Sequence, residues 1–387
     1  MDFSVVDDLA EHREAARVWA EANVDPAWAK EQHESGTHQT AGLHRLLARD
    51  GLLGAGWPPE YGGTDVDPGF AHAVMDELRS LGLMWDGWST TVMVINTISH
   101  VGSEEQKRTI IPAALRGELL ISLGYSEPDS GSDVAAASTR AVRDGEEWVI
   151  DGQKMFTSTA QVCSHVFVLT RTNAEVPKHK GLTLFLVPTA AAGFDLQPIY
   201  TLGGQQTNAT FYSGVRVPDS ARIGGVDAGW SVMHVALTFE RAGDRRAGVT
   251  LARKVADWVR RSGGEYGIDM DDAVTRERLA RIAIDEEVAG LLGMRVRWIS
   301  ESGGLPRAEG SMQKLFASEA SLRHYSELVD MLGASGVLQG DGAPMGGELE
   351  AHFRSTVVGT IYGGSSEIQR EIISELRLGL PKSRPAA

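Results

Sequence analysis

The sequence predicts an α+β protein in which a helical segment, an antiparallel β segment and a second helical segment follow one another. Apolar residues recur at helical spacing in residues 1–119, at about every second position in residues 120–225, and again at helical spacing in residues 226–387. We therefore expect an N-terminal helical domain, a middle β domain and a C-terminal four-helix bundle with these boundaries.

The composition is that of an ordinary globular protein. The 387 residues are 42% hydrophobic and 23% charged, which is enough apolar material for a substantial core. The formal net charge of -15 argues against general binding to nucleic acid or to anionic membranes. An anionic substrate would therefore need a local basic patch.

Cysteine usage and the start of the chain argue against further classes of protein, namely disulfide-bonded, Cys-metal, secreted and membrane-spanning proteins. Cys163 is the only cysteine, so an intramolecular disulfide and a Cys-based metal cluster are excluded. No His or carboxylate pair has metal-ligand spacing in a supporting context, and we expect no metal. The chain starts without a signal-peptide pattern, and no apolar run approaches the ~18 residues of a membrane span. We expect a cytoplasmic protein.

The first segment alternates helices with loops rich in glycine and proline. GLHRLLARDGLLG (residues 42–54) predicts a helix stopped by glycine, and WPPEYGG (residues 57–63) predicts a loop. AHAVMDELRSLGL (71–83) and SEEQKRTIIPAALRGE (103–118) predict further helices.

The middle segment carries strand and turn signals. STRAVRDGEEWVIDGQKMFTST (138–159) contains two Asp-Gly pairs, at 144–145 and 151–152, each between short strand-like runs. Both are hairpin signals and favour a meander. HVFVLTRT (165–172) and KGLTLFLVP (180–188) extend it with β-forming residues.

The last segment returns to helical spacing. Residues 227–262 form a long amphipathic pattern, and residues 276–300, 312–336 and 365–381 follow with the same period. Ser366 with Gln369 fits a capping box that would start the last helix directly after a glycine pair.

LGYSEPDSGSD (residues 123–133) marks the entry to the β segment. Its glycine and small hydroxyl residues allow a ligand to approach the backbone, with Ser126 and Ser132 as possible hydrogen-bond donors. Taken alone, the same stretch is also typical of an ordinary turn.

This stretch resembles the TEPxxGSD flavin signature of the acyl-CoA dehydrogenase family. WPPEYGG, GSEEQK, DGQKMFTST and the late SSEIQR match other family segments in the same order, so the resemblance covers essentially the whole chain. It implies FAD-dependent α,β-dehydrogenation of an acyl-CoA in fatty-acid β-oxidation, with an electron-transferring flavoprotein as partner. It also implies a dimer or tetramer, either of this chain alone or with a homologous subunit. Several segments resemble members that act on bulky or unusual acyl-CoAs.

The resemblance also implies roles for single residues. Phe156 replaces the tryptophan common at its position beside the flavin ring, and Ser158 replaces a threonine and keeps a hydroxyl for the flavin. The positions that match flavin contacts are Leu123, Tyr125, Ser126, Gly131, Ser132, Phe156, Thr157, Ser158, Ser365 and Glu367. The positions that match substrate contacts are Ser132, Arg241, Gly363 and Gly364.

The resemblance implies that the catalytic base lies on a different element of this chain than in many members of the family. In TIYGGSSEIQR, Gly363 occupies the position where many members carry their catalytic glutamate. In a subset of the family the base lies on the first helix of the C-terminal domain, and LTFER (237–241) places Glu240 there. Glu240 shares a helical face with Met233 and Ala236, where partial burial would raise its basicity. The alternative is an exposed Glu240–Arg241 charge pair.

Two departures from the family pattern support an alternative function. The family's Arg-x-x-Phe-Gly segment corresponds to residues 263–267, where the arginine is lost and only Arg260 or Arg261 lies near. A Gln-x-x-Gly-Gly segment corresponds to residues 330–334 and starts with Asp330. The alternative function is therefore a non-catalytic or half-site subunit of a hetero-oligomer. A third is an oxidase or hydroxylase on the same fold.

Overall fold

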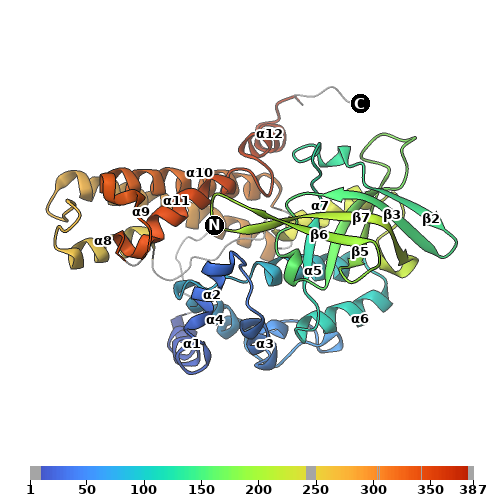
Figure 1. The fold of residues 1–387 in the computed structure, drawn as a ribbon, viewed down its shortest axis with the longest axis horizontal. Helices are drawn as coiled ribbons and strands as arrows, with labels where there is room; N and C mark the ends of the chain where they lie inside the picture. Colours follow the sequence, from blue (N-terminus) through green and yellow to red (C-terminus); the bar gives the residue numbers. More distant parts are fainter. Residues whose placement is uncertain (1–9, 241–249, 303, 305, 341, 382–387) are drawn as a thin grey trace. The chain divides into compact units, whose positions relative to one another are not determined.

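The computed structural model describes residues 10–240, 250–302, 304, 306–340 and 342–381. They fall into two compact units. The first contains residues 10–201 and 205–240, and the second contains residues 202–204 and the described chain from residue 250 onward (Figure 1).

The N-terminal part of the first unit is helical, as predicted. Buried Leu43, Leu78 and Ile95 belong to its core, and α3 ends before Gly51, whose φ of 72° stops the helix. At the start of α6, Ser103 and Gln106 form a capping box, and the Gln106 amide also donates to the carbonyls of Ser220 and Arg222. The helices are α1 (Ala10–Asn23), α2 (Ala27–Ser35), α3 (Ala41–Arg49), α4 (Pro68–Ser80), α5 (Asp86–Val101) and α6 (Glu104–Leu115).

The predicted β segment forms one sheet with the strand order β6-β7-β3-β2-β4-β5-β8, and β1 pairs with β4. Pairing is antiparallel apart from the parallel contacts of β4 with β1 and β2. The strands are β1 (Ile121–Gly124), β2 (Arg140–Asp144), β3 (Glu147–Lys154), β4 (His165–Arg171), β5 (Leu182–Pro188), β6 (Phe194–Tyr200), β7 (Gln206–Pro218) and β8 (Arg222–Ile223).

The sequences of strands β4 and β5 are nearly continuous apolar runs, because both faces of each strand are buried. Val166 and Val168 pack into a cluster with Trp148, whereas Phe167 and Leu169 pack into the core that contains α5 residues. The helix–sheet–helix order predicted from the sequence is confirmed.

The two Asp-Gly pairs have different roles. Asp144 pairs with Glu147 across the β2–β3 turn, so the first hairpin is confirmed. The second hairpin prediction is wrong, because Gly152 lies inside β3 at a shift of register against β7. A Cβ at Gly152 would lie 2.7 Å from the Cα of Thr139. Glycine is required here by close backbone approach at a bulge.

We expect Gly152→Ala to lower the free energy of unfolding by about 1–3 kcal/mol, since the added methyl group meets backbone and the φ of 146° disfavours a side chain. Urea unfolding measures the change. Gly145→Ala is the matched control, because Gly145 also has a positive φ but has no neighbour within 4 Å of the added Cβ. Equal losses in the two variants would show that the close approach has no energetic weight.

The amphipathic stretch 227–262 is divided. Helix α7 (Gly229–Glu240) packs within the first unit against α5 and β5, with Val232, Met233 and Ala236 buried. Thr250 has a non-helical backbone and caps α8 (Leu251–Ser262) through the N–H of Arg253. A new helix therefore begins at α8.

The second unit is helical, as predicted. Helix α9 contacts α8 and α10, and α10 also contacts α11 and α12. The carboxylate of Glu286 accepts hydrogen bonds from the N–H groups of Leu251 and Ala252 and so caps α8 from α9. The remaining helices are α9 (Ala273–Glu301), α10 (Arg307–Leu332), α11 (Glu348–Gly359) and α12 (Ser366–Leu376). Among the described helices, none is long and apolar enough to cross a membrane.

Candidate functional site

The segments that follow β1 and β3 lie side by side in the first unit. Leu123 lies in β1 and is partly buried, and Tyr125 and Ser126 follow it. The N–H of Met155, directly after β3, donates to the carbonyl of Ser126 at 2.9 Å. This hydrogen bond brings the start of the SEPDSGSD stretch beside the segment that contains Phe156.

Phe156 presents an aromatic ring to solvent. The residue is 62% exposed and its φ is 59°, an unusual backbone conformation for a bulky residue. The next residue, Thr157, anchors the backbone at Phe156. The N–H of Thr157 donates to the Asn208 carbonyl at 2.8 Å, and the Asn208 amide donates to the Thr157 carbonyl at 2.9 Å. The exposed ring is thus held by a buried, doubly bonded neighbour.

The predicted flavin contacts include exposed residues with hydroxyl groups. The Ser158 hydroxyl is 3.0 Å from that of Thr207 and belongs to an exposed residue. Gly131 and Ser132 are also exposed, and Gly131 has open space where a Cβ would lie. An exposed aromatic face and exposed hydroxyl residues on the same segments suit a flat heteroaromatic ring that carries hydrogen-bonding atoms.

A buried ion pair joins the segment after β1 to the end of β3, and sequence reasoning missed this pair. The Nζ of Lys154 lies 2.7 Å from Oε1 of Glu127, and both side chains are buried. Glu127 also accepts hydrogen bonds from the N–H and hydroxyl of Ser138 and from the N–H of Thr139, and Lys154 also donates to the carbonyl of Tyr125. Glu127 lies in the LGYSEPDSGSD stretch and Lys154 lies in DGQKMFTST, so these two motifs contained the only sequence signal for the pair.

Burial by itself would raise the pKa of the Glu127 carboxyl. The Lys154 ammonium and the Ser138 donors outweigh burial and lower this pKa to about 2. The carboxylate is therefore charged at neutral pH and connects the end of β1 to the end of β3.

The glycine loop lies in the second unit, between α11 and α12. Gly363 and Gly364 have φ values of 63° and 90°. The cap of α12 is Ser365, whose hydroxyl accepts from the N–H of Ile368, so the predicted Ser366–Gln369 capping box is wrong. The Gln369 amide instead donates to the carbonyls of Gly363 and Gly364.

A cavity of about 480 Å³ lies beside this loop. Ser365 and Glu367, two predicted flavin contacts, line it together with Glu319 and Arg323 of α10. The Glu367 carboxylate lies in the first turn of α12, and its own N–H and the Ser365 hydroxyl lower its pKa.

Part of the predicted site lies outside the described residues. Glu240 is the last residue of α7, but its side chain is not among those described, and Arg241 lies outside as well. The helix does bury Met233 and Ala236, which precede Glu240 by seven and four residues. The face on which Glu240 was predicted to lie is therefore apolar.

The departures from the family pattern lie at ends of helices in the second unit. Gly263 is the C-cap of α8 with a φ of 58°, a position that suits glycine. Arg260 is exposed and pairs with Asp257 at 2.7 Å, as expected of a helix-end cation. Asp330 is exposed near the end of α10.

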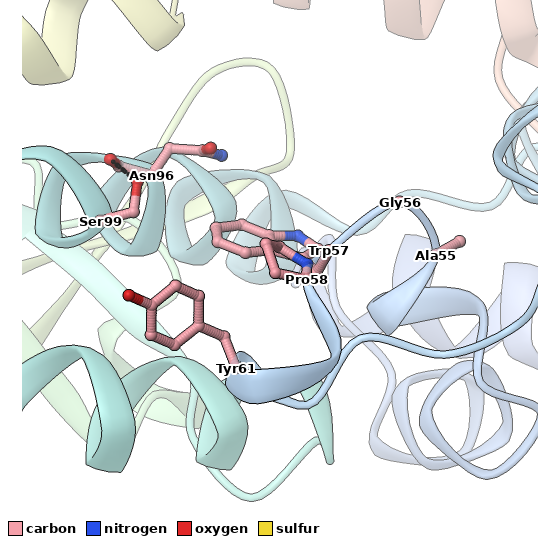
Figure 2. A pocket seen from close by; sticks show the side chains of 7 residues that line it. All are labelled: Ala55, Gly56, Trp57, Pro58, Tyr61, Asn96 and Ser99. Carbon is pink, nitrogen blue, oxygen red and sulfur yellow. Dashed lines mark hydrogen bonds between the residues drawn. The ribbon is translucent and has the colours of Figure 1, made fainter.

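A second cavity, of about 310 Å³, lies in the first unit at the WPPEYGG loop. Figure 2 shows the rings of Trp57 and Tyr61 beside Asn96 and Ser99 of α5. Asn96 donates to the Val92 carbonyl and Ser99 to the Asn96 carbonyl, so the helix itself uses donors from both side chains.

A helical segment, a sheet with an exposed aromatic ring, and a second helical segment follow one another in the described chain. Family models for acyl-CoA dehydrogenases match the chain three times: the N-terminal domain at residues 7–118, the middle domain at 122–213 and the C-terminal domain at 227–377. The chain belongs to the acyl-CoA dehydrogenase family, and members of this family use FAD.

Relatives match over most of their length. Acyl-CoA dehydrogenase FadE26 of Mycobacterium tuberculosis is 36% identical over 349 residues, which are 87% of each chain. IpdE1 of the same organism is 32% identical over 97% of this chain and 98% of its own.

Two solved structures share the fold closely. One is described as the Tcur3481-Tcur3483 steroid ACAD, with a TM-score of 0.87, 34% identity and coverage of 99% of this chain and 100% of that chain. The other is the ChsE4-ChsE5 complex from Mycobacterium tuberculosis, with a TM-score of 0.84, 33% identity and the same coverage.

Proposed function

We propose that this acyl-CoA dehydrogenase binds FAD and converts a bulky or branched acyl-CoA to the 2-enoyl-CoA. The observation that carries the proposal is the exposed Phe156 ring, which directly precedes the anchored residue Thr157 and is followed two residues later by the exposed Ser158. Phe156 would pack against the flavin ring, and Ser126, Ser132 and Ser158 would offer it hydroxyl groups. Bound FAD supplies the acceptor for the β-hydrogen, which leaves as hydride.

The chain itself has to move the α-proton. We propose that Glu240 removes it as general base, because Gly363 has no carboxylate. N–H groups of the Gly363–Gly364 loop would hold the thioester oxygen as negative charge develops there. Arg241 and Ser132 are proposed to contact the substrate. The loop lacks a side chain at Gly363, which leaves space for a large acyl group.

A local basic segment fits an anionic CoA on this acidic chain. Lys178 and Lys180 are exposed in the loop between β4 and β5. Lys178 reaches Asp133 of the SEPDSGSD stretch at 2.5 Å, which places this loop beside the predicted flavin surface. The steroid acyl-CoA dehydrogenase with 34% identity further supports a bulky acyl group.

We propose that the enzyme is cytoplasmic, passes its electrons to an electron-transferring flavoprotein and works as an oligomer. The alternative is a half-site subunit that pairs with an active homologue. The exposed acid at Asp330 and the glycine at Gly263, where the family pattern implies flavin-binding side chains, favour this alternative. Two of the similar structures are described as paired proteins.

The visible spectrum of the chain purified alone tests the proposal. We expect a yellow protein whose flavin band is bleached anaerobically by at least one member of a panel of straight, branched and steroid acyl-CoAs. Rapid reoxidation of the reduced flavin in air would instead indicate an oxidase. A colourless chain that takes up FAD only with a homologous partner would favour the half-site subunit.

A further inference from the structure

Two hydroxyl groups meet just after the exposed Phe156. The Oγ of Ser158 lies 3.0 Å from the Oγ1 of Thr207 in β7, which is a hydrogen-bonding distance. Ser158 is exposed, whereas Thr207 is only 7% exposed. The hydrogen bond therefore joins a buried residue of the sheet to an exposed residue of the predicted flavin surface.

The backbone at Ser158 is fixed on both sides. Its N–H donates to the Phe156 carbonyl at 2.9 Å, and its carbonyl accepts the hydroxyl proton of Thr159 at 2.6 Å. Thr207 is held by the pairing of β7 with β6, and its β-branched side chain has few rotamers. The side-chain torsion of Ser158 is the remaining freedom, and the hydrogen bond to Thr207 restricts this torsion.

Burial favours one of the two hydroxyl groups as the donor. A hydroxyl has one proton to donate and two lone pairs that accept. Among the described residues, Ser158 is the only hydrogen-bond partner of the Thr207 side chain. If Ser158 were the donor, the Thr207 proton would lack an acceptor at a buried residue, which is unfavourable. Ser158 carries no such cost, because an exposed hydroxyl can donate its proton outward.

We propose that Thr207 is a positioning residue, which donates to Ser158 so that the Ser158 proton stays available for the flavin ring. The inference rests on the proposed binding of FAD beside Phe156. N5 of oxidised flavin can only accept a hydrogen bond, so the direction of the Ser158 proton matters. A hydroxyl that accepts one hydrogen bond becomes a stronger donor in another, so Thr207 also polarises Ser158. Thr207 touches neither substrate nor flavin in this role and acts through Ser158.

Thr207→Val tests the proposal in the FAD-loaded chain, because valine keeps the shape of threonine without the hydroxyl. The probe is FAD labelled with ¹⁵N at N5, whose chemical shift reports hydrogen bonding to that atom. We expect this shift to move toward its value for flavin in an aprotic solvent, and the Kd of FAD to rise about 3- to 10-fold. Thr207→Ser should restore both values. Thr170→Val is the matched control and should change neither, since the buried Thr170 donates to the Thr183 carbonyl in β5.

Urea unfolding of the chain without FAD provides a readout that needs no flavin. Thr207→Val should lower the urea midpoint in the wild type. It should leave the midpoint unchanged or raise it in a Ser158→Ala background, where the Thr207 proton has already lost its acceptor. A midpoint that Thr207→Val lowers equally in both backgrounds, or raises in the wild type, would overturn the proposal.

The N5 chemical shift decides the direction of the hydrogen bond. A shift that Thr207→Val leaves unchanged, or moves away from the aprotic value, would show that Thr207 does not donate to Ser158 in the wild type. If Thr207→Val does not fold, a wild-type urea midpoint in Ser158→Ala would overturn the proposal. A wild-type chain that takes up no FAD would contradict the proposed function, whereas the unfolding comparison would still decide separately whether Thr207 donates to Ser158.

Discussion

Glu240→Gln is expected to slow flavin bleaching by an acyl-CoA by about 10²–10⁴-fold, the usual contribution of a positioned general base. Glutamine keeps the shape of the side chain but cannot accept the α-proton. Substrate binding should change little, so the loss should appear in kcat. Anaerobic stopped-flow absorbance on the purified flavoprotein measures the effect.

Two further variants make the result specific. Asp244→Asn removes the acid four residues later in the sequence and should leave the bleaching rate within a few-fold of the wild type. Gly363→Glu in the Glu240→Gln background should restore part of the rate by returning a carboxylate to the loop. Restoration will be incomplete because position 363 has a φ of 63°, which strains any side chain. A Glu240→Gln enzyme that bleaches at the wild-type rate would show that Glu240 is not the base.

Glu127→Gln is expected to lower the free energy of unfolding by about 3–5 kcal/mol, because it leaves the Lys154 ammonium buried without its counter-charge. The loss should also weaken flavin binding, since the pair connects the end of β1 to the segment before Phe156. Urea unfolding followed by circular dichroism, together with the flavin content of the purified variant, measures both effects.

The double variant Glu127→Gln, Lys154→Met is the control. Removing both charges should recover most of the lost stability, because the cost arises from an unpaired buried charge. A double variant less stable than Glu127→Gln alone would contradict this account.

The same pair gives a pH dependence with a definite sign. The pKa of Glu127 is lowered from 4.5 to about 2 in the folded protein. Its contribution to stability is therefore fully present above about pH 4.5 and is lost as the pH falls toward 2. The stability difference between the wild type and Glu127→Gln should shrink over this range. A difference that is independent of pH between 5 and 2 would show that folding does not lower the pKa of Glu127.

Sequence reasoning chose the residues of the candidate site through the motifs of one family. It selected Ser126, Phe156 and Ser158, and the structure places these residues at the neighbouring ends of β1 and β3. It did not show that Phe156 is exposed with a positive φ, because that depends on the bonds between Thr157 and Asn208 in another strand. The catalytic role of Glu240 stays a prediction.

The amino-acid sequence by itself determined the family, the helix–sheet–helix order and the first hairpin, because side-chain periodicity and turn chemistry are properties of neighbouring residues. Only the tertiary structure decided that Gly152 lies in a bulge against Thr139, that Glu127 and Lys154 form a buried pair, and that the Gln369 amide holds the glycine loop. These features depend on which segments the folded chain brings into contact. The same residues in a motif can form a turn, an exposed charge or a capping box. Only the burial of the side chains and the direction of the backbone distinguish these structures.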